Sequence, residues 1–115
     1  MTKYLVLAAV LATASGAALA QSHEALDALA SKSGCLACHN VEKKVVGPSY
    51  MEVAAKYKGD KTAQAKLEKK VKEGGTGVWG QIPMPPNTIP SDADIKKLVT
   101  MILALNPPKA GEKQK

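Results

Sequence analysis

Apolar residues recur at helical spacing in three stretches of the chain. The positions are Leu26, Leu29 and Ala30; Ala63, Leu67 and Val71; and Ile95, Leu98, Val99, Ile102 and Leu105. Steps of three and four residues place these side chains on one face of a helix, and polar residues fill the other faces. The pattern predicts helices over residues 22–33, 61–73 and 91–105.

Turn and capping residues mark the ends of these helices. Ser22 and Ser91 are good N-cap residues, and both are followed by acidic residues that favour a helix N-terminus. A further short helix, residues 50–57, is expected after the turn at Gly47-Pro48. The predicted fold is therefore all-α, a single domain with about four helices.

The first twenty residues have the pattern of a secretory signal peptide. Lys3 supplies the positive charge, residues 4–12 are apolar, and Ala18-Leu19-Ala20 is a small-x-small cleavage site. The apolar run is short and interrupted, so an uncleaved membrane anchor is the less favoured alternative. We expect residues 1–20 to be removed and residues 21–115 to form one periplasmic domain without a membrane span.

Composition indicates that the core of this domain contains a non-protein group. The chain has no Phe, and its aromatic residues after the signal are Tyr50, Tyr57 and Trp79. A small domain buries a modest share of its surface and gains stability from a bound cofactor. A large, flat, apolar cofactor would supply the missing bulk.

The segment Cys35-Leu36-Ala37-Cys38-His39 predicts what that group is. Two thiols three residues apart face the same way, and an imidazole follows the second thiol. C-x-x-C-H is the attachment signature of haem c, in which both thiols form thioethers and the histidine binds iron. A redox disulfide would need a βαβ pattern, and a zinc site would need His23 as a further ligand.

A second candidate iron ligand lies in a proline-rich segment. Met84 stands between Pro83 and Pro85, which makes its backbone extended and largely fixed. A thioether is a weak, soft ligand, so a pre-ordered loop helps it stay on iron. Met51 and Met101 lie in helical patterns and are interpreted as packing residues. The carbonyl of Pro48 is a candidate acceptor for the other ring N–H of a metal-bound histidine, or part of an ordinary turn.

Taken together, these motifs resemble those of the small class I bacterial cytochromes c, the periplasmic type that donates electrons to nitrite reductase. The matching segments are Gly34-Cys35-Leu36-Ala37-Cys38-His39, Val46-Gly47-Pro48, Gly77-Val78-Trp79-Gly80 and Ile82-Pro83-Met84-Pro85-Pro86-Asn87. Their order and spacing cover nearly all of the chain after the signal.

The resemblance implies a role for individual residues. His39 and Met84 are the expected axial ligands of the haem iron, and Pro48 accepts a hydrogen bond from His39. Trp79 is expected to donate to a haem propionate and Asn87 to hydrogen-bond near the sulfur of Met84. Relatives often carry an arginine where this chain has Lys70, and lysine lacks the bidentate fork of arginine.

The function implied is that of a monomeric electron carrier rather than an enzyme. Its partners would be a quinol–cytochrome c reductase-type donor and an acceptor of nitrite reductase, peroxidase or terminal oxidase type. The formal charge is +6 and every basic residue is lysine. Export and the lack of arginine argue against nucleic acid, and a basic surface can steer docking onto acidic proteins. The alternatives are a small peroxidase-like haem enzyme with an openable sixth site, and a haem-based gas sensor.

Overall fold

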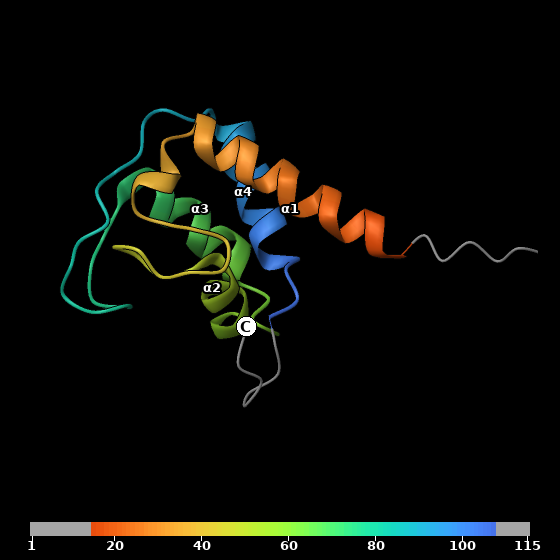
Figure 1. Ribbon diagram of the computed structural model, residues 1–115. Helices are drawn as coiled ribbons and strands as arrows, with labels where there is room; N and C mark the ends of the chain where they lie inside the picture. Colours follow the sequence, from red (N-terminus) through yellow and green to blue (C-terminus); the bar gives the residue numbers. More distant parts are fainter. Residues whose placement is uncertain (1–14, 108–115) are drawn as a thin grey trace, which may run out of the picture.

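The computed structural model describes residues 15–107, with side chains from residue 23 onward (Figure 1). Four α-helices and one 3₁₀ turn make up the regular structure of this part of the chain. They are α1 (Ser15–Lys32), the 3₁₀ turn η1 (Cys35–Ala37), α2 (Tyr50–Lys56), α3 (Ala63–Glu73) and α4 (Asp92–Leu103). Residues 15–107 contain no strand, only an isolated bridge between Gly75 and Met84. The expected all-α fold is confirmed.

The start of α1 differs from the prediction. The helix begins at Ser15, so the N-cap predicted at Ser22 is wrong in the full chain. Residues 17–20 are alanine and leucine, which have high helix propensity, and they let the helix continue through Ser22. Residues 1–14, which hold most of the predicted signal, lie outside the described part. The bounds of α2, α3 and α4 agree with the predictions within two residues.

Helix α4 is the central element of the fold. It packs against α1, α2 and α3 (Figure 1). Its apolar face is buried as predicted. Leu26 and Ala30 of α1 meet this face with no exposed surface. Met51 of α2 is also buried, and Met101 packs against the same cluster, so both act as packing residues.

Two long loops extend from the same side of the helices. The His39 loop (residues 39–49) and the Met84 loop (residues 74–91) both lie to the left in Figure 1. Six of their apolar side chains are between 42% and 69% exposed: Val45, Val46, Val78, Trp79, Ile82 and Ile89. A loop as long as the Met84 loop is uncommon without a function. The two loops therefore present apolar surface that a bound group would cover.

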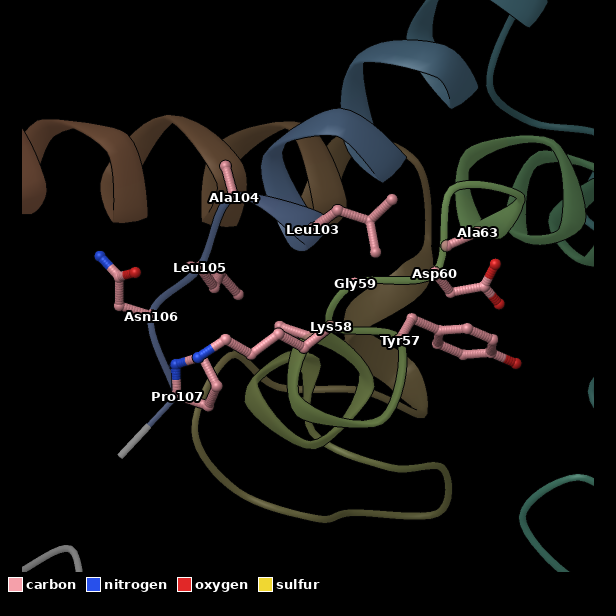
Figure 2. Close-up of a pocket in the computed structure, with 11 residues that line it drawn as sticks. Tyr57, Lys58, Gly59, Asp60, Ala63, Leu103, Ala104, Leu105, Asn106 and Pro107 are labelled. Carbon is pink, nitrogen blue, oxygen red and sulfur yellow. The ribbon is translucent and has the colours of Figure 1, made fainter. Parts of the chain in front are cut away.

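One cavity lies away from these loops, where the ends of α2 and α4 meet the start of α3. It has a volume of about 340 Å³ and is lined by Tyr57, Asp60, Leu105 and Asn106 among others (Figure 2). It contains none of the residues predicted to bind haem. In residues 15–107, no helix has both the length and the apolar character needed to cross a bilayer.

Candidate functional site

Cys35 and Cys38 lie on a tight turn that directly follows α1. Gly34 has a φ of 75°, a left-handed conformation that glycine adopts without strain, and it lets the chain leave the helix. The carbonyl of Cys35 then accepts from the backbone N–H groups of Cys38 at 3.1 Å and His39 at 2.9 Å. The turn is 3₁₀ rather than α-helical. It brings the two thiols and the imidazole into one short segment.

Both cysteines are half-buried free thiols, and they are not joined to each other. Burial raises the pKa of the Cys35 thiol, an effect partly opposed by a hydrogen bond with Tyr50. Thiol–disulfide exchange proceeds through a thiolate, and a raised pKa disfavours that form. The lowered pKa that activates many redox thiols is therefore not found at Cys35.

The ring of His39 is held from three directions. Its Nδ1 lies 2.8 Å from the carbonyl oxygen of Pro48, and its plane stacks on Tyr50 with centroids 5.4 Å apart. A Cβ added to Gly47 would lie 2.5 Å from His39 Cε1, so only glycine leaves room for the ring there. A hydrogen bond from Nδ1–H to Pro48 leaves the lone pair on Nε2 free to bind a metal.

The His39 loop is folded back so that Pro48 can reach this ring. The N–H groups of Val46 and Gly47 both donate to the carbonyl of Cys38, at 3.2 and 2.7 Å. Tyr50 N–H donates to Asn40 at 3.0 Å, just after the loop. The backbone of the loop is therefore tied to the same turn that carries the two thiols.

Met84 is half-buried on a loop whose backbone is fixed at that residue. Met84 and Gly75 exchange two backbone hydrogen bonds of 2.8 and 2.9 Å. A Cβ on Gly74 would collide with the carbonyl oxygen of Met84 and with Pro86, so the two arms of the loop touch here. Outside the loop, Lys72 and Asp92 form an ion pair at 2.8 Å that joins its two ends.

Asn87 connects the Met84 loop to the cysteine turn. Its side-chain amide donates to the carbonyl of Ser33 at 2.8 Å and lies 4.0 Å from the sulfur of Cys35. Its backbone N–H donates to Val71 of α3 at 2.9 Å. The expected hydrogen bond near the sulfur of Met84 stays a prediction, because the side-chain amide of Asn87 contacts Ser33 and Cys35.

Trp79 and Lys70 lie around the same loop. Trp79 is 42% exposed, and the ammonium of Lys56 lies 5.2 Å from the centroid of its ring. The ammonium of Lys70 lies against Gly75, close to where a Cβ would stand. Lys56 and Tyr50 were not singled out as site residues from the sequence. The roles of Lys56 and Tyr50 depend on tertiary contacts that no local sequence pattern predicts.

Other metal chemistry finds no support in the described residues. Within residues 15–107, no three His, Cys, Asp or Glu side chains are grouped so that they could hold a metal ion. His23 therefore does not complete a zinc site with Cys35 and Cys38. The fold presents one imidazole and two thiols on a single turn, next to loops whose apolar side chains are exposed.

These residues fit a flat, apolar, iron-containing ring. Two free thiols suit thioether bonds, the oriented imidazole suits an iron ligand, and the exposed apolar side chains suit the ring faces. The fold and the site together define a small all-α protein that carries one covalently bound haem.

The chain belongs to the cytochrome c family, whose model matches residues 16–106. Cytochrome c-551 of Allochromatium vinosum is 61% identical over 77 residues, which cover 67% of this chain and 82% of that protein. Cytochrome c-552 of Nitrosomonas europaea is 52% identical over 93 residues, 80% of this chain and 90% of that one. The crystal structure of wild-type Nitrosomonas europaea cytochrome c552 matches with a TM-score of 0.67 at 54% identity, covering 70% of this chain and 99% of that one.

These findings confirm the resemblance to the small class I bacterial cytochromes c. The prosthetic group of the family is a covalently bound haem c with its iron. The chain is accordingly an electron carrier, and its partners are redox proteins.

Proposed function

We propose that this chain is a periplasmic electron carrier that holds haem c through Cys35 and Cys38 and its iron between His39 and Met84. The observation that carries the proposal is the 2.8 Å contact between His39 Nδ1 and the carbonyl of Pro48. It fixes the ring orientation and leaves Nε2 as the metal-binding nitrogen. This nitrogen belongs to the residue that directly follows the second thiol.

Haem c supplies a one-electron Fe(III)/Fe(II) couple when it is bound. The protein would keep the two ligand residues in place, so that little rearranges during electron transfer. Pro48 and Gly47 hold the ring of His39, while the bridge to Gly75 holds the backbone of Met84. Trp79 would donate to a propionate, and Asn87 would secure the Met84 loop against the cysteine turn.

Ligation by Met84 also favours a carrier over an enzyme. A peroxidase-like activity needs an open iron position and a nearby acid–base group. Met84 would fill that position, and His39 would serve as the other iron ligand. The relatives are themselves cytochromes c-551 and c-552, which supports the same choice.

The periplasm is proposed as the location because residues 1–20 have the pattern of an export signal. Removal of these residues would leave a single domain, residues 21–115, that works as a monomer. A quinol–cytochrome c reductase-type donor would reduce it. A nitrite reductase, peroxidase or terminal oxidase-type protein would accept its electron.

Intact-mass measurement on a periplasmic extract tests the proposal. The expected species is the chain from Gln21 to Lys115 plus one haem. The haem should stay attached to the protein during extraction with acidified organic solvent. The Cys35→Ala, Cys38→Ala double variant is the control, and its haem should be extracted. A wild-type protein that loses its haem to the solvent, or carries none, would rule the attachment out.

A further inference from the structure

Lys56 makes a contact that links α2 to the Met84 loop. It lies in the last turn of α2, and its Nζ is 5.2 Å from the centroid of the Trp79 ring. An ammonium at this distance from an indole face is attracted to it by the ring quadrupole. Trp79 lies near the tip of the loop, between the glycines Gly77 and Gly80.

The rest of the Met84 loop is anchored elsewhere. Gly74 N–H donates to Lys70 at 2.8 Å and Asn87 N–H to Val71 at 2.9 Å, so both arms are attached to α3. In the described structure, the hydrogen bonds of residues 76–83 stay inside the loop, from Thr76 and Gly77 to Gly80 and Gln81. Lys56 is therefore the residue that ties the tip of the loop to a helix.

The glycines on both sides of Trp79 make the contact with Lys56 important for the position of the indole. Gly77 and Gly80 have φ values of 101° and 114°, and a Cβ at either position would meet no atom within 4 Å. A hydrogen bond between these two glycines closes the tip of the loop, and no atom of another element lies beside their Cβ positions. A cation placed over the indole face adds a contact from outside the loop.

We propose that Lys56 is a positioning residue for Trp79, and that it places a positive charge beside the indole proposed to bind a haem propionate. The inference rests on the proposed role of Trp79. The contact would have two consequences. It would keep the indole N–H in the orientation that binds the propionate. The ammonium would also favour the reduced haem, which carries one positive charge less than the oxidised haem. The ammonium of Lys56 is then occupied by Trp79 and is less free to contact a redox partner.

The test uses the only tryptophan of the chain, which gives a single indole N–H signal in the spectrum of the reduced holoprotein. Lys56→Ala should speed hydrogen exchange of this N–H by about two- to fivefold, as expected for loss of an exposed cation–π contact. Lys56→Arg should restore the wild-type rate. Lys58→Ala, which removes the same charge from an exposed position two residues away, should leave the rate unchanged.

The reduction potential supplies the second readout. At low ionic strength it should be lower in Lys56→Ala than in Lys58→Ala, and added salt should narrow the difference. Unchanged exchange in Lys56→Ala overturns the inference, and so does an increase that Lys56→Arg fails to reverse. If the wild-type indole N–H already exchanges as fast as free indole, the proposed Trp79–propionate hydrogen bond fails instead.

Discussion

The carboxylate of Asp60 is held by donors on its own stretch of chain. Thr62 donates to it from its hydroxyl at 2.6 Å and from its backbone N–H at 2.8 Å, and Lys66 lies at 3.2 Å. The hydrogen bonds from Thr62, followed by the contribution of Lys66, lower the pKa of Asp60 from 3.8 to about 2. The ionised form is therefore the one that the folded state prefers.

A pKa lowered by folding predicts the direction of a pH effect. The stabilisation is complete above the pKa of the unfolded chain and is lost as pH falls through the folded value, a window from about 4 to 2. Asp60→Asn should make the free energy of unfolding fall less steeply across this window in denaturant titrations of the holoprotein. Thr62→Ala should act in the same direction but less, because its backbone N–H still donates. An unchanged slope in Asp60→Asn would contradict the assignment.

Single residues also mark how far the site could be predicted. Cys35, Cys38 and His39 lie within five positions, so their joint orientation follows from one turn of chain. The hydrogen bond from Asn87 to Ser33 spans 54 residues, and the Lys56–Trp79 contact joins a helix to a distant loop. No local pattern encodes these pairings, because they form only when the Met84 loop packs against the end of α1 and against α2.

At the level of single elements, the short helix α2 depends on its N-terminus. Ser49 accepts from the N–H of Glu52 at 3.1 Å, while the Glu52 carboxylate accepts from the N–H of Ser49 at 2.7 Å. This reciprocal capping box satisfies donors that a helix leaves free, and Ser49 is 2% exposed. Since α2 directly follows Pro48, the cap also fixes the carbonyl that faces His39.

Replacement of the two helix caps should have unequal effects. Ser49→Ala should lower the free energy of unfolding by about 1–2 kcal/mol, because the lost cap is buried and reciprocal. Ser91→Ala, the matched variant at the exposed cap of α4, should cost less, about 0.5–1 kcal/mol. Urea unfolding of the holoproteins measures both. Equal losses would mean that burial of Ser49 adds nothing to its role as a cap.

Helix bounds were predictable where capping chemistry is local. Ser91 caps α4 as expected, since its hydroxyl accepts from Asp94 N–H at 3.1 Å. The predicted start of α1 was wrong because the residues before Ser22 also favour a helix, so the helix continues through this serine. The composition of neighbouring residues, rather than the capping residue alone, decides such a boundary.

On the scale of the whole molecule, charge bears on how the carrier meets its partners. Lys43 and Lys44 are exposed on the His39 loop, beside the exposed Val45 and Val46. Long-range attraction to an acidic redox partner would raise the encounter rate, and salt would screen it within a Debye length of about 8–10 Å. The alternative is docking through the apolar side chains alone.

The salt dependence of electron transfer separates these two modes of docking. We expect the second-order rate with an acidic partner to fall steeply as ionic strength rises. Replacing Lys43 and Lys44 by glutamate should flatten that dependence more than the same change at the exposed Lys58 and Lys61, of which Lys58 lines the cavity of Figure 2. A rate that does not respond to salt would leave the apolar surface as the docking site.

The all-α architecture and the family were predictable because the motifs are specific and ordered along the chain. The arrangement of the two loops was less predictable, because it depends on close approaches at glycines. Gly47 lies against the ring of His39, and Gly74 lies against the backbone of Met84. Proline and glycine positions indicate that a loop is fixed. They do not state what it is fixed against.

The central proposal is that His39 and Met84 would both bind the haem iron. The visible and near-infrared spectrum of the oxidised holoprotein, with and without azide, tests it most directly in Met84→Ala. We expect this variant to lose the methionine-to-iron band and to bind azide, while the matched variant Met101→Ala keeps the band and excludes azide. Survival of the band in Met84→Ala would contradict the ligand assignment.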